Sequence, residues 1–498
     1  MAAIDGLQQL DRSQAPARPE PTAAESDHLR AIATFFDRFA SDEQRWRRRN
    51  RTYHRLVESI HRFLVADGAS VLEIGSGSGD LLAALGPSRG VGIDVSEGMT
   101  ALARERHPDL EFHTASGERF VADERFDYVV LSDLVPYAYD LEELLRNVRT
   151  MTHERSRIVI HSYSQLWRPL IRLAELLRLK PRKPIHNWVA IGDARNLLEL
   201  ADMEVLTVSR QILFPKKLPL LTTFLNGVVA RIPLIRHLCV TWWVVARPRP
   251  EQAREELSVS IVVPCRNEAG MIDEIVRRTP ELGSETELIF VEGGSSDDTP
   301  GAIERAIAAN PERRIAFYKQ TGKGKGDAVR LGFERARNDL LMILDADLTV
   351  APEDLPKFYR AVAGGHADFA NGSRLVYELA PGAMQSLNVL GNKFFSATFS
   401  ALLEQPVKDT LCGTKVLRKA DYEAIARSRA YFGDFDPFGD FDLLLGAARR
   451  RMKIVDVPVR YGARTYGQTN ISRFRHGWLL LQMAVFAFGK LKVKPVRI

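Results

Sequence analysis

Residues 340–350 read LLMILDADLTV, an unbroken apolar run that ends in two carboxylates separated by one residue. The run predicts a strand buried on both faces, as in a parallel sheet covered by helices. Asp345 and Asp347 would carry a desolvation cost at the end of such a strand unless a positive charge compensates them. Mg²⁺ or Mn²⁺ meets that need and keeps coordination positions open for diphosphate oxygens. The alternative is an acidic turn that caps the following helix, a common role for a lone pair of carboxylates.

Polar and glycine-rich turns precede this run and suggest a ligand crevice. The strand patterns SVSIVVPCRNEAG (258–270) and ELIFVEGGSSDDT (287–299) both end in polar residues, where ligands bind in open α/β sheets. Further on, KQTGKGKGDAV (319–329) sets Lys325 between glycines at the start of a predicted helix, which suits a pyrophosphate. The order GxxxxGK[ST] is absent, so this loop is not a Walker A motif.

A second nucleotide-type unit lies nearer the N-terminus. ASVLEIGSGSGDLLAAL (69–85) predicts a strand, a glycine turn and a helix, and the strand pattern GVGID (90–94) follows. The glycines allow a sharp bend and a close approach of the backbone to a ligand. Asp94 is spaced to accept hydrogen bonds from a ribose diol.

The glycine spacing is ExGxGxG rather than GxGxxG, and it resembles motif I of class I S-adenosylmethionine-dependent methyltransferases. The resemblance continues through GIDVSEGM (92–99) and FDYVVLSDLVPYAYD (126–140). It implies a Rossmann-like domain that binds S-adenosylmethionine, with Asp94 at the ribose. The methionine part of the cofactor would lie among Glu73, Gly75, Gly77 and Gly79. In the run TASGERF, Ser116 stands near the position where relatives carry an acidic residue beside the adenine, and Glu118, two residues further on, could take that role. A degenerate domain kept as a scaffold is the alternative.

The second half resembles inverting family 2 glycosyltransferases of the GT-A fold, and most of all dolichyl- or polyprenyl-phosphate mannose synthases. The motifs, in order, are VPCRNE, VEGGSSDDT, GKGKG, DADLT, GSR, DTLCGTK and PVRYGARTYG. The resemblance implies a nucleotide-sugar donor and a metal held by Asp345 and Asp347. It also implies that Lys325 and Arg374 face the donor phosphates and that Arg464 lies near donor or acceptor phosphates. The base and ribose would be bound by Pro264, Asn267, Glu268 and Glu292.

The sequence departs from the family pattern at positions that concern the nucleotide base of the donor, the metal and the acceptor. Relatives have a second acid where Gly293 follows Glu292, and a glutamine where Thr349 stands. Asp442, in DPFGDFDLLLGAA (436–448), would act as general base on a hydroxyl acceptor, whereas an ionised phosphate acceptor needs no strong base. The other interpretation of that turn is helix capping by Asp440.

Charge and composition indicate what kind of surface the chain contacts and where it acts. Residues 151–250 carry sixteen Lys or Arg and six Asp or Glu, although the whole chain has a net charge of only +6. The basic residues alternate with apolar stretches at 218–234 and 239–246, which favours membrane-surface contact over nucleic-acid binding, with ordinary core helices as the alternative. Three widely spaced cysteines, no signal peptide and no run of 18 apolar residues favour a cytoplasmic chain, peripheral at the inner face of the membrane.

The sequence therefore predicts two joined α/β enzymes, a Rossmann-like methyltransferase followed by a GT-A glycosyltransferase. The reaction expected is inverting, metal-dependent transfer of a sugar from a nucleotide diphosphate sugar to a lipid-linked acceptor such as polyprenyl phosphate. The alternatives are transfer to a polysaccharide or glycolipid hydroxyl and a non-catalytic membrane scaffold. The tail is expected to be an interfacial or a buried helix. The predicted divisions are a disordered leader (1–26), the methyltransferase domain (27–205), a basic and apolar extension and linker (206–256), the glycosyltransferase domain (257–475) and an amphipathic basic tail (476–498).

Overall fold

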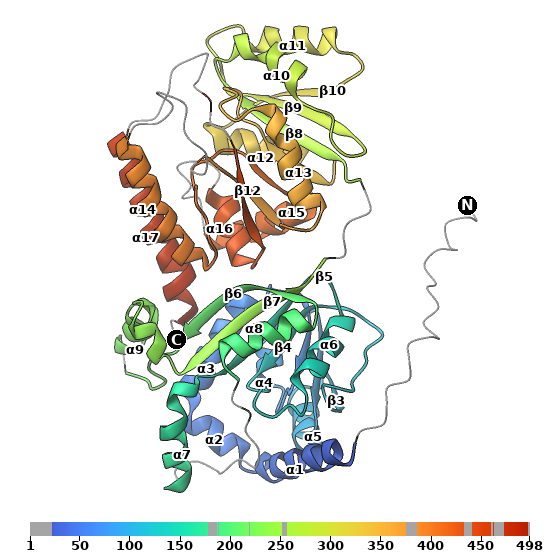
Figure 1. Cartoon of the computed structure of the whole chain (residues 1–498), viewed down its shortest axis with the longest axis vertical. Coiled ribbons are helices and arrows are strands. Elements are labelled where there is room, and N and C mark those ends of the chain that lie inside the picture. Colours follow the sequence, from blue (N-terminus) through green and yellow to red (C-terminus); the bar gives the residue numbers. More distant parts are fainter. Residues whose placement is uncertain are drawn as a thin grey trace, which may run out of the picture.

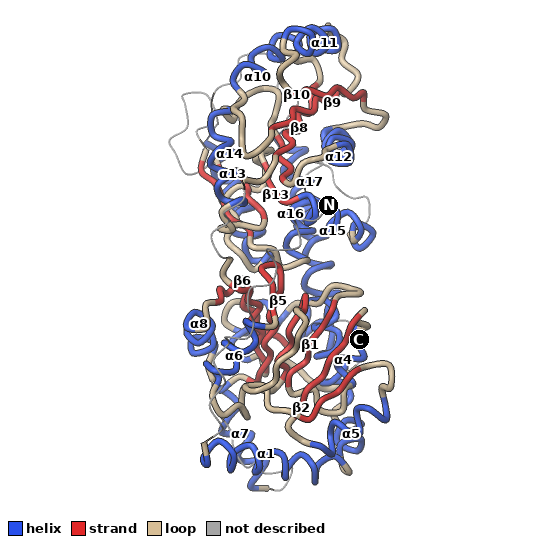
Figure 2. Tube along the Cα trace, turned by 90° about the vertical axis from the view of Figure 1, so that its right-hand side faces the viewer, coloured by secondary structure: helices blue, strands red, loops and turns tan. Residues whose placement is uncertain are grey.

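The computed structural model contains two α/β units, one above the other in Figure 1. It describes residues 22–177, 187, 189–218, 220–250, 256–374, 386–432, 441–459, 462 and 473–496. Within these ranges the strands form two seven-stranded sheets, one in each unit (Figure 2). Both fold-class predictions, a Rossmann-like domain followed by a GT-A-like domain, agree with these sheets.

The first sheet has the strand order β3-β2-β1-β4-β5-β7-β6. Strands β1 to β5 run parallel, and β7 runs antiparallel between β5 and β6. The elements of this unit are α1 (Ala23–Ala40), α2 (Glu43–Arg49), α3 (Arg51–Leu64), β1 (Ser70–Ile74), α4 (Asp80–Leu85), β2 (Arg89–Asp94), α5 (Glu97–Arg106), β3 (Glu111–Thr114), β4 (Phe126–Ser132), α6 (Leu141–Thr150), β5 (Thr152–Tyr163), η2 (Gln165–Trp167), α7 (Arg168–Leu176), α8 (Ile191–Leu200), β6 (Met203–Gln211), α9 (Leu221–Gly227), η3 (Val229–Arg231), η4 (Ile235–Leu238) and β7 (Thr241–Pro248).

The second sheet has the order β10-β9-β8-β11-β13-β12-β14, with β10, β9, β8 and β11 parallel and β13 antiparallel to both its neighbours. Its elements are β8 (Val259–Cys265), α10 (Ile272–Arg278), β9 (Thr286–Glu292), α11 (Thr299–Ala309), β10 (Arg314–Lys319), α12 (Lys325–Arg335), β11 (Leu340–Ile343), α13 (Leu355–Ala363), β12 (Phe369–Ser373), α14 (Ser386–Leu403), β13 (Lys415–Arg418), α15 (Lys419–Arg427), η7 (Arg429–Tyr431), α16 (Phe441–Arg449), β14 (Ile454–Pro458), α17 (Arg473–Phe488), η8 (Gly489–Val493) and η9 (Lys494–Val496).

The apolar runs become central strands because both faces of each sheet are covered. All four residues of β11 are buried, as LLMI predicted. β7 is also buried along its whole length, and Trp243 is only 1% exposed. The prediction of membrane contact is therefore wrong for 239–246, because its apolar side chains are enclosed by the sheet and its neighbours.

The segment expected to be an extension and linker, 206–256, contributes to the first sheet. It holds most of β6 and all of β7, and β7 joins β5 to β6 by antiparallel pairing. At the other end of this unit, α1 already begins at Ala23, with the Thr22 hydroxyl accepting a hydrogen bond from the Glu25 amide. The leader expected to reach Ser26 is thus helical over its last residues, and residues 1–21 lie outside the described ranges.

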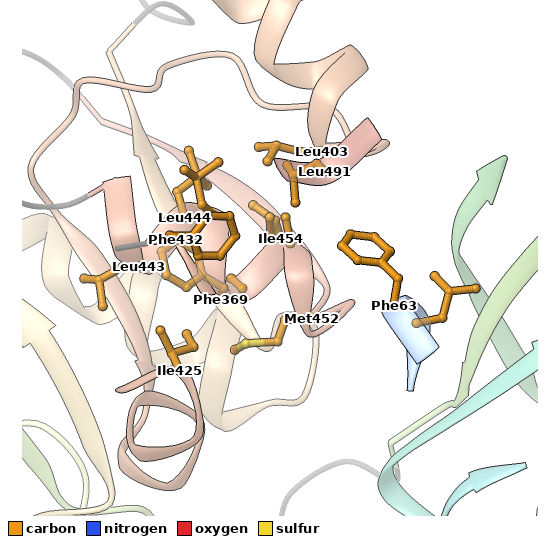
Figure 3. Packing of buried hydrophobic residues seen from close by; sticks show 14 of the residues in the cluster. Phe63, Phe369, Leu403, Ile425, Phe432, Leu443, Leu444, Met452, Ile454 and Leu491 are labelled. Atoms are coloured by element: carbon orange, nitrogen blue, oxygen red, sulfur yellow. The ribbon is translucent and has the colours of Figure 1, made fainter. Parts of the chain in front are cut away.

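The two units share an apolar contact centred on Phe63 at the end of α3. One cluster of buried side chains continues from Phe63 to Leu403, Met452 and Leu491 of the second unit (Figure 3). The Arg449 guanidinium lies 4.5 Å from the centre of the Phe63 ring and donates a hydrogen bond to the Phe63 carbonyl. The two units are therefore joined by a packed apolar interface as well as by the linker.

Polar side chains surround that apolar contact. Arg157 of β5 and Arg247 of β7 both donate to the carboxylate of Asp368, which directly precedes β12. Arg247 also donates to Glu204 at 2.6 Å, and Glu204 receives the Lys453 ammonium at 2.5 Å. Because these guanidinium groups are almost fully buried, their pairing fixes the relative position of the sheets.

The tail forms α17, which is apolar on two sides. Met483 and Ala487 are fully buried, whereas Trp478 and Val485 are 61% and 67% exposed. One side of the helix is therefore part of the core, as the buried alternative predicted, and the other side faces outward; the interfacial role stays a prediction. In the described part of the chain, no helix combines the length and apolar character that crossing a bilayer requires.

Candidate active sites

The predicted methyl-donor turn follows β1 and has the left-handed backbone that only glycine adopts readily. Gly75, Gly77 and Gly79 have φ values of 75°, 52° and 74°. A Cβ at Gly75 would lie 3.0 Å from Leu134, and one at Gly79 would lie 2.5 Å from Phe112. Both the conformation and the space thus require glycine, and the turn leads directly into α4.

Two buried carboxylates flank this turn. Glu73 is 2% exposed, and burial raises its pKa to about 8. Asp94 accepts 2.9 Å hydrogen bonds from the amides of Gly77 and Ser96. Burial nevertheless raises the pKa of Asp94, since those amides offset only part of the desolvation. The structure thus brings together the five residues predicted for cofactor binding.

The Glu118 carboxylate, considered for the adenine, is engaged within the protein. The Ser116 hydroxyl donates to one oxygen at 2.6 Å, and the Tyr139 amide donates to the other at 3.0 Å. Glu118 is only 4% exposed. It therefore anchors the segment after β4, and the adenine contact stays a prediction.

Sequence reasoning missed a polar group beside the glycine turn. β1 and β4 are paired, so Asp133, the residue after β4, lies next to the turn that follows β1. The Tyr53 hydroxyl donates to Asp133 at 3.2 Å, and the Tyr53 ring stacks on Tyr163 at 5.6 Å. Asp133 has a φ of 55°, unusual for a residue other than glycine. The available signal was an aspartate at the end of an apolar strand, the same signal that identified Asp345.

The predicted base- and ribose-binding residues come from two adjacent strand ends. Asn267, with a φ of 58°, follows β8 and accepts a 2.7 Å hydrogen bond from the Ser296 amide. Glu292, the last residue of β9, accepts from the Ser295 amide and is 5% exposed. The Glu268 amide donates to the Thr299 hydroxyl at 2.9 Å. Pro264 is the next-to-last residue of β8, so all four residues lie at or just beyond the carboxyl ends of the neighbouring strands β8 and β9.

Asp345 lies directly against Lys325 in this structure. The Lys325 ammonium is 2.5 Å from the Asp345 carboxylate, and Lys325 is the first residue of α12. Burial would raise the pKa of Asp345, but the Lys325 charge outweighs it and holds that pKa below its ordinary value. Gly413 covers the pair so closely that a Cβ there would overlap both the carboxylate and the ammonium.

Asp347 is fixed by the residue that replaces the expected glutamine. One Asp347 oxygen accepts from the Thr349 amide at 3.1 Å and from the Thr349 hydroxyl at 2.8 Å. Thr349 is 5% exposed, so this contact is well shielded. Thr349, which stands where relatives have a glutamine, therefore orients the Asp347 carboxylate.

A metal at this position would rely on few protein ligands. Across the described ranges, no group of three or more His, Cys, Asp and Glu side chains could hold a metal ion. Asp345 and Asp347 offer hard oxygen donors, which suit Mg²⁺ or Mn²⁺. The donor set fits a cation that completes its coordination with diphosphate oxygens and water.

The remaining predicted residues differ in how they are held. Arg374 makes a bidentate contact with Asp409, at 2.6 and 2.9 Å, and Asp409 is 2% exposed. Asp442 is 8% exposed and lies 3.1 Å from Arg429 and 3.3 Å from Arg330. Arg464 and Asp440 lie outside the described residues.

The two sites define a class of protein: a chain with two α/β domains, each with a glycine-containing or polar turn at the carboxyl ends of parallel strands. Residues 45–208 match the family model described as a methyltransferase domain, and residues 260–425 match glycosyl transferase family 2. The chain is therefore an enzyme that joins a methyltransferase domain to a family 2 glycosyltransferase domain. This confirms the predicted fold class and enzyme class.

Relatives of the second domain are moderately similar. The low-salt glycan biosynthesis hexosyltransferase Agl6 of Haloferax volcanii is 30% identical over 245 residues, 48% of this chain and 56% of the relative. An undecaprenyl-phosphate 4-deoxy-4-formamido-L-arabinose transferase of Pseudomonas fluorescens is 36% identical over 112 residues, 22% of this chain and 33% of the relative. The matches thus span from a third to just over half of these relatives' lengths.

A solved structure of glucosyl-3-phosphoglycerate synthase from Mycobacterium tuberculosis, bound to Mn²⁺, uridine diphosphate and its product, aligns with 47% of this chain and 80% of its own. Its sequence identity is 16% and its TM-score 0.32.

Proposed function

We propose that the second domain transfers a sugar, with inversion, from a nucleoside diphosphate sugar to a lipid-linked acceptor such as a polyprenyl phosphate. The chain would act in the cytoplasm, attached peripherally to the inner face of the membrane. The observation that carries the proposal is the Lys325–Asp345 ion pair beside Asp347, at the end of β11 and the start of α12. The similarity to an undecaprenyl-phosphate 4-deoxy-4-formamido-L-arabinose transferase supports the acceptor class.

Each of these residues has a defined task. Asp345 and Asp347 would hold Mg²⁺ or Mn²⁺, which supplies positive charge to the leaving diphosphate. Lys325 neutralises Asp345 in the ligand-free protein, and its position at a helix N-terminus favours a bound phosphate. Thr349 keeps the Asp347 carboxylate in a single orientation.

The surroundings of Asp442 favour a phosphate acceptor over a hydroxyl acceptor. Two guanidinium groups, those of Arg429 and Arg330, lie within 3.3 Å of one Asp442 oxygen. A carboxylate engaged in this way would have to leave its ion pairs to take a proton from an acceptor hydroxyl. A phosphate acceptor is already ionised at neutral pH and needs no such base.

Sugar transfer to a polyprenyl phosphate, measured with a set of nucleotide sugars and Mn²⁺, tests this proposal. Asp347→Ala is expected to lower the turnover at least a hundredfold, because it removes a metal-holding carboxylate. Asp273→Ala, at an exposed position in the same domain, is the matched control and should retain parental turnover. Equal turnover in both variants would contradict the assigned role of Asp347.

For the first domain we propose methyl transfer from S-adenosylmethionine to a hydroxyl group, such as one on the same glycan. The cofactor supplies an electrophilic methyl group, and Glu73, the glycine turn and Asp94 would bind it. We assign Asp133 the role of accepting the hydroxyl proton, since its carboxylate lies beside the turn and already accepts a hydrogen bond from the Tyr53 hydroxyl. The joining of both domains in one chain motivates the shared glycan.

Two measurements on Asp133→Asn test this assignment separately from folding. Calorimetric binding of S-adenosylmethionine should match that of the parent protein, because Asp133 is not among the residues proposed to bind the cofactor. Methyl transfer to glycans should fall at least tenfold, and the loss should be smaller at high pH, where hydroxyl groups ionise more readily. Full activity in the variant would overturn the assignment.

A further inference from the structure

Exposed apolar side chains gather on a small part of this protein. Among the described residues, seventeen of the twenty exposed large apolar side chains belong to residues 166–177, 218–238, 394 and 478–485. Single exposed leucines are ordinary on soluble proteins, but a concentration of this kind marks a binding surface. We call these four segments the apolar face.

The apolar face is continuous and crosses the domain boundary. α14 contacts α17, and the residues after α17 contact α9, where a Cβ on Gly227 would lie 3.4 Å from Val493. The Trp167 indole donates to the Leu238 carbonyl at 3.0 Å and so connects the start of α7 to the end of η4. In Figure 1, α14, α17, α9 and α7 follow one another down one side of the molecule.

Several side chains of the apolar face are held far out from the core. Leu220 and Leu234 are 89% and 84% exposed, more than most others in the set. Leu220 also has a φ of 60°, outside the backbone regions that a leucine ordinarily adopts. Such a side chain is expected where a partner outside the chain covers it.

The charged residues of the apolar face indicate what kind of partner covers it. The sequence contains no Asp or Glu between 213 and 240 or between 473 and 496. The same stretches contain eleven Lys, Arg and His residues, of which Lys216, Lys217, Arg236, His237 and Lys494 are exposed. The segment 166–177 adds two arginines and one acid, Glu175. Apolar side chains that penetrate a surface, surrounded by many cations and few acids, match an anionic lipid bilayer and disfavour an acid-bearing protein groove.

We propose that the apolar face docks the whole enzyme on an anionic membrane, with the methyltransferase domain contributing as much of the contact as the glycosyltransferase domain. The inference deepens the proposed function and rests on it for its purpose, since a polyprenyl phosphate resides in a bilayer. Both domains then meet the membrane in one orientation, because the buried ion pairs of Arg157 and Arg247 fix the sheets relative to each other.

Flotation of the full-length protein with vesicles tests this face directly. Vesicles of phosphatidylglycerol and phosphatidylcholine should bind the parent at low salt, whereas pure phosphatidylcholine vesicles and 1 M salt should weaken binding. The double variant Leu220→Asp, Leu234→Asp should bind about tenfold or more weakly, because two outward leucines no longer enter the lipid. Trp478→Asp with Val485→Asp should weaken binding by a similar factor.

The chain offers a matched control outside the apolar face. Val121 is 61% exposed, and Val121→Asp should leave vesicle binding unchanged. Parental binding by the Leu220/Leu234 variant would overturn the contribution of the methyltransferase domain. A parent protein that ignores vesicles but sediments as a dimer, with the dimer lost in that variant, would overturn the lipid partner in favour of self-association.

The same variants keep this inference distinct from the proposed sugar transfer. With a short-chain polyprenyl phosphate dissolved in detergent, the Leu220/Leu234 variant should retain parental turnover. Vesicle binding without any sugar transfer by the parent would uphold the apolar face and overturn only the proposed acceptor. An equal loss of turnover in detergent would overturn the face, because it would indicate general damage to the enzyme.

Discussion

Removal of one carboxylate at the domain boundary should weaken the whole molecule. Asp368 accepts hydrogen bonds from Arg157 at 2.6 Å, from the Lys453 amide at 2.9 Å and from Arg247. Arg157 and Arg247 are 5% and 1% exposed, so they cannot turn to water when the carboxylate is lost. Asp368→Asn therefore leaves two buried positive charges without the negative charge that they share.

The expected magnitude follows from this burial. An exposed ion pair contributes about 0–1 kcal/mol, whereas loss of one partner from a buried pair costs about 3–5 kcal/mol. Glu204 still neutralises part of the Arg247 charge, and asparagine keeps some hydrogen bonds. We therefore expect the free energy of unfolding to fall by about 3 kcal/mol, at the lower end of that range.

Urea unfolding, followed by circular dichroism and tryptophan fluorescence, measures this loss. Asp123→Asn, at an exposed position of the first domain, should change the free energy of unfolding by less than about 0.5 kcal/mol. The difference between parent and Asp368→Asn should also depend on pH. Burial raises the pKa of Asp368, but Arg157 and Arg247 outweigh it and hold the pKa below 3.8. The contribution of this carboxylate is thus present above about pH 4 and lost as the pH falls through the lowered pKa.

A loss smaller than about 1 kcal/mol in Asp368→Asn would refute the reasoning, since it would mean that water reaches both guanidinium groups. So would a difference that does not decrease as the pH falls below about 4.

Three further predictions concern the two active sites. Gly413→Ala should raise the dissociation constant for the nucleotide sugar at least tenfold, because its methyl group overlaps the Asp345 carboxylate and the Lys325 ammonium; unchanged calorimetric binding would contradict this arrangement. Asp442→Asn should retain turnover within about threefold on a polyprenyl phosphate, and a loss of a hundredfold or more would instead support the general-base role on a hydroxyl acceptor. Burial raises the pKa of Glu73 to about 8, above the 4.5 of the unfolded chain, so unfolding releases its proton and stability decreases as the pH rises between these values. Glu73→Gln should therefore be more stable than the ligand-free parent at pH 8 by about 4 kcal/mol, and equal stability of the two would show that Glu73 is already ionised.

Local motifs predicted the strand ends of both domains well. The glycine turn at 75–79 and the aspartates after 340–343 were identified because each combines a strict local conformation or charge with an apolar strand. The same logic would have identified Asp133, which follows the apolar strand 126–132.

Misassignments arose where apolar character has more than one explanation. The stretch at 239–246 and the leucines at 218–238 have similar composition, yet the first is a buried central strand and the second is largely exposed. Composition cannot separate them, because burial depends on which strands flank a segment. Antiparallel pairing of β7 with β5 and β6 decided the outcome.

By itself, the sequence determined that this chain carries a methyltransferase and a family 2 glycosyltransferase, because short motifs with fixed spacing impose the turns that those domains need. The tertiary structure alone decided which partners hold the predicted side chains: Lys325 on Asp345, Thr349 on Asp347, and two arginines on Asp442. It also decided that Arg157 and Arg247 meet Asp368 across the domain boundary, more than a hundred residues away in sequence. Such contacts depend on how the sheets come together in space, which no local pattern of residues specifies.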